Sequence, residues 1–89
     1  MSTSSDVVQS LGQARSSVQT AIRQIDDLIV EHDYQDVALL IAQAGEALLE
    51  AAAQLMQSQD EAALETLDRA DDLLDNAYAI IEGDLEEDE

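Results

Sequence analysis

Hydrophobic residues recur every three or four positions along most of the chain, which is the spacing of one face of an α-helix. In the first third, the repeat begins at Val7 and is still in phase at Leu28. This pattern predicts an amphipathic helix over residues 5–31. Its hydrophobic positions are Val7, Leu11, Ala14, Val18, Ala21, Ile25 and Leu28.

The same spacing predicts a second helix over residues 34–57, whose apolar arc is about half of the circumference. The polar stripe of this helix is narrow, so we expect it to be the most buried of the chain. Gly45 lies in the arc among alanines, where small side chains let another helix approach closely, from the same chain or from a second copy. The hydrophobic positions are Val37, Ile41, Ala44, Leu48, Ala51 and Leu55.

A third helix is predicted over residues 59–82, again from hydrophobic positions at alternating steps of four and three. Ser58 and Glu61 form an S-x-x-E capping box at its start, and Gly83 is a natural C-terminal cap. Residues 84–89 are almost entirely acidic, which predicts a disordered tail. The hydrophobic positions are Ala63, Leu67, Ala70, Leu74, Ala77 and Ile81.

The first two helices have start signals of their own. Ser4 or Ser5 can cap the first helix, and Asp6 then lies near the positive end of its dipole. Asp33 can cap the second helix, with Asp36 in support.

The two joints contain neither Gly nor Pro, so the phase of the repeat has to locate them. The repeat is lost near His32–Tyr34 and slips by one residue near Gln57–Gln59, and we place a turn at each. Two short connections favour an all-α fold, an antiparallel up-down-up three-helix bundle in one domain over residues 1–83. The alternative is a two-helix hairpin that completes its core by dimerising.

The composition predicts a thin core. The chain has 89 residues with no Phe, Trp, Cys or Pro, and alanine buries little area. A small domain with such a core favours self-association or unusually close helix packing. Without cysteine there is neither a disulfide nor a thiolate metal site. The first residues lack the basic-then-apolar plan of a signal peptide, so we expect a cytoplasmic protein.

The formal net charge is −18, with 21 acidic residues, three Arg and no Lys. Such a chain repels itself at ordinary ionic strength, but the Debye length falls to about 3 Å at 1 M salt. We therefore interpret the acidity as adaptation to a cytoplasm that holds molar salt. The alternative is mimicry of nucleic acid, in which the acids occupy a basic surface of a DNA- or RNA-binding protein.

Residues 37–56 form the most apolar window and have about the length that spans a bilayer. Glu46 and Glu50 lie within this window, together with Gln43 and Gln54. We therefore expect a helix buried in protein and no membrane association.

One short segment suggests chemistry. Residues 71–75, with the sequence DDLLD, resemble the aspartate-rich DDxxD motif of prenyl-diphosphate enzymes, which implies carboxylates that hold magnesium against a diphosphate. That family also needs a large helical cavity and a second motif, which this chain does not supply, so we interpret the acids as a solvated face. His32 is the only histidine, and we interpret it as the residue that ends the first helix.

The sequence contains no nucleophile–base pair and no phosphate-binding glycine loop, so we predict a protein that is not an enzyme and uses no metal or cofactor. Without a basic patch or aromatic platform, direct nucleic-acid binding is not expected. The predicted function is protein–protein interaction or regulation, with a protein partner or a second copy in a dimer. A further alternative is a small accessory subunit of a larger complex.

Charge is spread unevenly, which suggests a contact surface. Residues 1–25 carry a net charge of +1, residues 26–57 one of −7, and residues 58–89 one of −12. A protein that is acidic for solubility should be acidic wherever it meets water, so the neutral outer face of the first helix is a candidate interface. Leu39 and Leu64 lie on otherwise polar faces and are secondary candidates. The other candidates are Gly45 and the neutral residues Gln9, Gln13, Ser16, Thr20 and Gln24.

Overall fold

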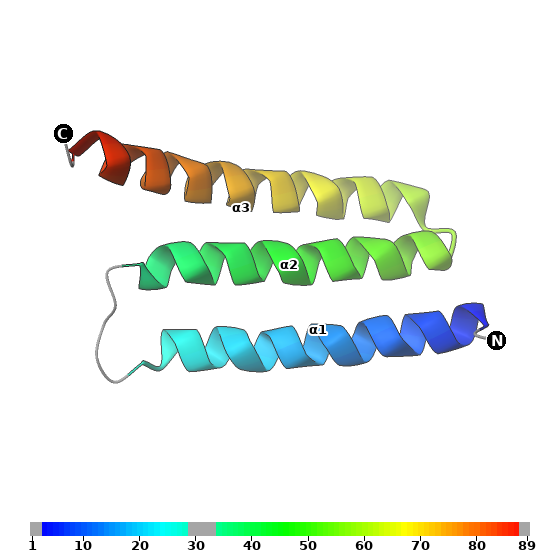
Figure 1. The fold of residues 1–89 in the computed structure, drawn as a ribbon. Coiled ribbons are helices and arrows are strands. Elements are labelled where there is room, and N and C mark those ends of the chain that lie inside the picture. Colours follow the sequence, from blue (N-terminus) through cyan, green and yellow to red (C-terminus); the bar gives the residue numbers. More distant parts are fainter. Residues whose placement is uncertain (1–2, 29–33, 88–89) are drawn as a thin grey trace.

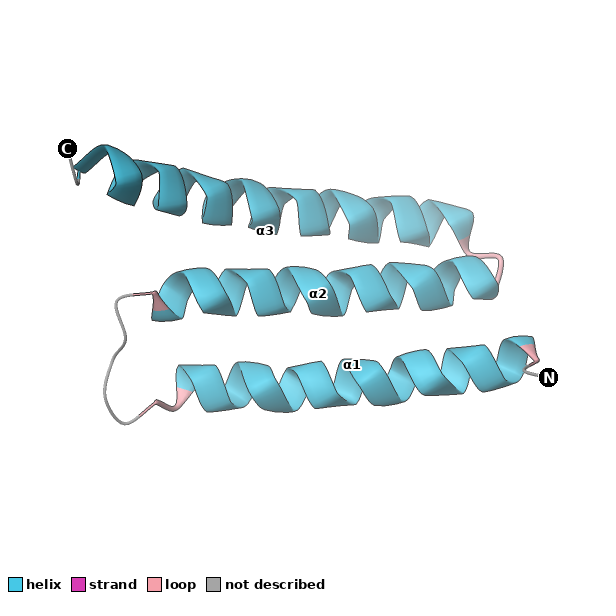
Figure 2. Ribbon diagram, viewed as in Figure 1, coloured by secondary structure: helices cyan, strands magenta, loops and turns pink. Residues whose placement is uncertain are grey.

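The computed structural model describes the backbone of residues 3–28 and 34–87, and the side chains as far as Gly83. Three helices follow one another in antiparallel directions: α1 (Ser4–Asp26), α2 (Gln35–Met56) and α3 (Asp60–Glu87). The all-α, up-down-up prediction is confirmed (Figure 1). The two-helix alternative is wrong, because a separate turn divides α2 from α3, as Figure 2 shows in pink.

Helix α2 lies between the other two helices (Figure 1). It packs against both α1 and α3, while no Cα of α1 lies within 8 Å of a Cα of α3 among the described residues. The chain measures 51 × 28 × 20 Å and its radius of gyration is 15.5 Å, whereas a compact domain of this length has about 12 Å. The bundle is therefore open, because α1 and α3 do not close on each other.

A capping box begins α1, although at a different residue from the predicted one. The N-cap is Thr3, not Ser4 or Ser5: its hydroxyl accepts the Asp6 amide hydrogen at 3.2 Å, and its own amide donates to the Asp6 carboxylate at 3.3 Å. These two bonds satisfy amide groups that have no partner inside the helix. The favourable place predicted for Asp6 in the first turn is confirmed.

The turn between α2 and α3 is a Schellman motif centred on Ser58. The Gln59 amide donates to the Gln54 carbonyl at 2.8 Å, and the Ser58 amide donates to the Leu55 carbonyl at 3.1 Å. Ser58 has a φ of +61°. The turn predicted at Gln57–Gln59 is confirmed, but Ser58 ends α2 rather than capping α3, so the predicted capping box with Glu61 is wrong.

Replacing Ser58 by glycine is expected to stabilise the protein. A left-handed backbone costs a residue with a Cβ about 1 kcal/mol, and glycine adopts it freely. We expect Ser58→Gly to raise the melting temperature by about 4 °C in molar salt. Ser10→Gly, at an exposed position within α1, is the control and should lower it by a similar amount. A lower melting temperature for Ser58→Gly would show that the left-handed turn is not present in solution.

The other helix ends differ from the predicted bounds. Helix α1 ends at Asp26, before the predicted residue 31, whereas α3 continues through Gly83 to Glu87. Gly83 does not have positive φ, so the predicted C-cap is wrong. Residues 84–87, predicted as part of a disordered tail, are helical. Each added turn makes further backbone hydrogen bonds, which offsets the cost of a glycine of about 1 kcal/mol.

Two predictions concern the residues between α1 and α2, namely His32 as the end of the first helix and Asp33 as the cap of the second. His32 and Asp33 lie outside the described residues. The N-cap position of α2 is occupied by Tyr34, which makes no side-chain capping bond, so the cap predicted at Asp33 is wrong. Asp36 lies in the first turn as predicted.

The residues buried in the contact between α2 and α3 are small. No side chain larger than Val37 is buried among the described residues, and α1 has no buried residue. The small residues are Ala44, Ala47 and Ala51 of α2, and Ala63, Thr66, Ala70 and Ala77 of α3. Helix α3 packs against α2 and not against α1 in the part of the chain that the structure describes, and its alanines allow α2 and α3 to approach closely. The prediction that α2 is the most buried helix agrees with its central position.

Helix α1 packs less closely than was predicted from its hydrophobic repeat. Val18, Ala21 and Ile25 are half-buried, whereas Ala14 and Leu28 are exposed, so their assignment to the core is wrong. The Gln35 side-chain amide donates to the Ile25 carbonyl at 2.8 Å and joins the end of α1 to the start of α2. In the described part of the chain, no helix has the length and hydropathy needed to cross a membrane.

Candidate interaction surface

One face of the open bundle is polar, and ion pairs around Glu50 connect its helices there. Arg69 of α3 lies 2.6 Å from the Glu50 carboxylate, and Arg15 of α1 lies 3.5 Å from it. Arg15 also contacts Glu46 at 3.4 Å, and Gln19 donates to the same carboxylate at 3.1 Å. Two of the three arginines therefore connect the outer helices to α2. Such exposed pairs contribute about 0.2–1 kcal/mol each, and less in high salt.

A buried polar contact lies near this face. Thr66 is almost fully buried, and its hydroxyl oxygen lies 2.8 Å from Gln54 Oε1 and 2.9 Å from the Ala62 carbonyl oxygen. The single hydroxyl hydrogen serves one acceptor at a time. Gln54, one of the polar residues within the apolar window 37–56, is thus part of the α2–α3 contact.

The opposite face of α2 carries three large apolar side chains that the chain itself leaves half uncovered. Ile41, Leu48 and Leu55 are 48%, 46% and 52% exposed. They are seven residues apart and therefore share one side of the helix. Glu46 and Glu50 each stand two residues from Leu48, so they point away from it. The sequence assigned these three residues to the core, and that assignment is wrong for the single chain.

Helix α3 extends the same surface. Leu67 and Leu74 are half-buried, Ile81 is 37% exposed, and the three again share one side at seven-residue spacing. Leu67 stands two residues before Arg69, so it points away from the polar face. We call the combined surface the apolar face. It consists of Ile41, Leu48 and Leu55 of α2 and Leu67, Leu74 and Ile81 of α3.

The total surface is large for a chain of this size. It amounts to 6473 Å², whereas a folded monomer of 9.6 kDa exposes about 5,100 Å². The excess of about 1,400 Å² is greater than the ~800 Å² that each partner buries in a standard interface. The open arrangement thus leaves enough surface for a stable protein contact.

The structure separates the predicted interface residues. The neutral stripe is exposed along α1, and the Thr20 hydroxyl donates to the Ser16 carbonyl of its own helix at 3.2 Å. Leu64 is 63% exposed, whereas Leu39 is half-buried. Leu39 stands seven residues before Glu46 and therefore shares its side of α2. Gly45 is half-buried and lies beside the apolar face. The exposed neutral residues are Gln9, Gln13, Ser16, Thr20 and Gln24.

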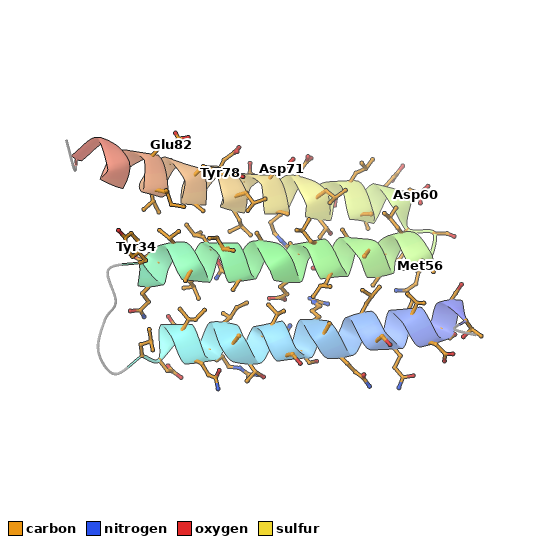
Figure 3. The ribbon with its side chains drawn as sticks, in the orientation of Figure 1. Tyr34, Met56, Asp60, Asp71, Tyr78 and Glu82 are labelled. Carbon is orange, nitrogen blue, oxygen red and sulfur yellow. The ribbon has the colours of Figure 1, made fainter. Side chains whose placement is uncertain are left out.

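The aspartates of the DDxxD segment are exposed on α3. In Figure 3, Asp71 lies with Asp60 and Glu82 along the side of α3 away from α2. Asp72 and Asp75 are exposed as well, and no group of three or more acidic, His or Cys side chains among the described residues is arranged to hold a metal ion. The interpretation of this segment as a solvated face agrees with these positions.

Two clefts occur where α1 meets α2. The larger, of about 290 Å³, contains Gly12 and is bordered by Arg15 and Glu50, which are already ion-paired. The smaller, of about 230 Å³, lies where Ser4 and Ser5 approach Met56. Neither cleft brings together a nucleophile and a base.

Comparison with protein-family models, with curated proteins and with solved structures finds no match to this chain. The apolar face was missed at the level of sequence because its large residues and the buried alanines share one apolar arc. The seven-residue spacing of Ile41, Leu48 and Leu55, which alternates with that of Ala44 and Ala51, is the signal that distinguishes the two sets.

Proposed function

We propose that this protein is a non-enzymatic protein–protein interaction module that binds through the apolar face. The observation that carries the proposal is the half exposure of Ile41, Leu48 and Leu55 in the centre of the bundle. Burying the exposed half of a leucine or isoleucine contributes about 1 kcal/mol. The three residues of α2 would thus contribute about 3 kcal/mol to a complex, and the α3 residues would add to this.

The physical case for a partner is that the chain buries little by itself. The buried hydrophobic residues are six alanines and Val37 among the described residues, while the larger side chains remain partly in water. Contiguous apolar surface on a small domain usually marks a binding site. A partner that covers the apolar face would supply the missing core and bind at the same time.

The acidity has a separate role in this proposal. Apart from Glu46 and Glu50, the acids of the described side chains are not ion-paired with arginine, and the acidic side chains of α3 from Asp60 to Glu82 are exposed to water. We attribute them to solvation in a cytoplasm with molar salt, where apolar contacts between acidic chains are not opposed by repulsion.

A second candidate function is the mimicry of nucleic acid, and a specific feature of α3 favours it. Five acids lie on its exposed side at alternating steps of four and three, so neighbouring Cβ atoms are about 5–6 Å apart. Such a row resembles a line of phosphates and would occupy a basic surface. We call these residues the acidic stripe: Glu61, Glu65, Asp68, Asp72 and Asp75.

Photo-crosslinking in the source cells tests both functions. A photoreactive amino acid is introduced singly at Leu48 in the apolar face, at Asp72 in the acidic stripe, or at Gln13 in the neutral stripe. Our proposal expects strong protein adducts from position 48 and much weaker ones from positions 72 and 13. Mass spectrometry identifies the adducts, including those with a second copy of the chain.

The three positions give separable results. Adducts only from position 72, with basic nucleic-acid-binding proteins, would replace our proposal by mimicry. Adducts only from position 13 would move the interface to the neutral stripe. If position 48 gives no adduct although the protein is folded and abundant, the apolar face is not a binding surface.

A further inference from the structure

The exposed side of α2 alternates large and small residues in an order that complements itself when reversed. Along the helix, this side reads Ala38, Ile41, Gly45, Leu48, Ala52 and Leu55. Steps of three and four keep all six on one side of the helix. If a second α2 lies antiparallel with its centre between residues 46 and 47, every large side chain meets a small one.

We propose that the apolar face is a two-fold interface between two copies of this chain, with α2 packed antiparallel on α2. Gly45 then lies opposite Leu48 of the second copy, Ile41 opposite its Ala52, and Ala38 opposite its Leu55. A two-fold axis repeats each contact, as an isologous interface requires. This inference rests on the proposed function and specifies the partner.

Gly45 gives independent support for a neighbour outside the chain. Glycine inside a helix is destabilising relative to alanine, so its presence there calls for a packing reason. A Cβ built on Gly45 would meet no atom within 4 Å, so no contact within the chain requires the glycine. The close approach of Leu48 from a second copy would require it.

The available area also fits a dimer. The chain exposes about 1,400 Å² more than a compact monomer of its mass, against the ~800 Å² per partner of a standard interface. The paired side of α2 contains no charged residue, so the axis of the dimer brings no like charges together. The acidic α3 helices lie near each other in this arrangement, and the dimer is therefore expected to form in molar salt and weaken on dilution of the salt.

The experiment measures mass in molar potassium chloride by sedimentation equilibrium for the wild type and three variants. The wild type is expected at twice its 9.6 kDa monomer mass. Gly45→Leu places an extra side chain against Leu48 at two equivalent sites and should raise the dimer dissociation constant by about 100-fold or more. Leu48→Ala leaves a cavity at the same sites and should raise it by at least about tenfold.

The double variant Gly45→Leu with Leu48→Ala restores a large residue opposite a small one. We expect its dissociation constant to return to within about tenfold of the wild-type value, because the volume at each site is conserved. Gly12→Leu is the matched control, since Gly12 also lies within a helix with no atom within 4 Å of a built Cβ. It should leave the dimer unchanged. The helical circular dichroism of each variant reports whether it is folded.

The second pair, Ala52→Leu and Ile41→Ala, repeats the test at the contact between Ile41 and Ala52 of the second copy. If Gly45→Leu does not fold, the dissociation constants of this pair and of its double variant test the inference instead. A wild type that is monomeric in molar salt overturns the inference, as does a double variant that is no better than the worse single variant. If the purified chain is monomeric while position 48 forms adducts with a different protein in cells, the dimer is excluded and the proposed function stands. If both measurements are negative, both are excluded.

Discussion

In dilute buffer, the chain is expected to lose most of its helical circular dichroism, and to regain it when molar potassium chloride is added. A net charge of −18 on 89 residues opposes folding, and the small alanine contacts supply little to offset it. Reducing the salt from 1 M to 0.01 M lengthens the Debye length from about 3 Å to about 30 Å, which is longer than the short dimensions of the chain. Repulsion then acts between all three helices.

A variant separates charge screening from other effects of salt. Changing the five acids of the acidic stripe to their amides removes five negative charges from α3 and leaves both helix contacts in place. This variant is expected to reach full helicity at a clearly lower salt concentration than the wild type. Sucrose, which favours folded states without screening charge, should rescue the wild type less effectively than salt of equal molarity. Full helicity and unchanged melting of the wild type in dilute buffer would contradict the salt-adaptation proposal.

Replacing Ala70 by leucine is expected to cause a large loss of stability by a different mechanism. Ala70 of α3 is only 1% exposed and lies in the contact with α2. A leucine there has no space unless the two helices move apart, which costs about 2 kcal/mol. In molar salt, the melting temperature should fall by about 8–16 °C, as followed by circular dichroism.

Ala79→Leu is the control for that substitution. It makes the same change on the same helix at an exposed position, and alanine and leucine have similar helix propensity. We expect it to change the melting temperature by less than about 3 °C. Equal effects of the two substitutions would mean that α2 and α3 are not packed through their alanines.

Both expectations follow from one property of the molecule: its helices approach closely, but they bury few large apolar side chains. The α2–α3 contact depends on alanines, and the α1–α2 contact buries no α1 residue. The ion pairs around Glu50 connect the three helices on the polar face, and molar salt weakens these pairs. An additional contact on the apolar face, as proposed, would therefore contribute strongly to the stability of the folded protein.

The sequence by itself determined the three helices and their order. Hydrophobic residues at every third or fourth position form one apolar side of a helix, and a helix of this kind is stable in water only if that side is covered. The slip in the repeat located the turn at Gln57–Gln59, although the sequence did not reveal the left-handed backbone of Ser58. Local hydrogen bonding selected Thr3 instead of Ser4 as the cap of α1, a difference of one residue that the repeat does not define.

Only the tertiary structure decided which part of the apolar arc of α2 is covered by its neighbours. Small side chains permit a close approach, so α3 packs where Ala44 and Ala51 lie. Ile41 and Leu48 each stand three residues before one of these alanines, beside the contact, and remain half exposed. The periodicity gives the width of an apolar arc, whereas the direction from which each helix approaches depends on the shapes of both surfaces. For that reason, the residues that the sequence placed in the core became the candidate interaction surface.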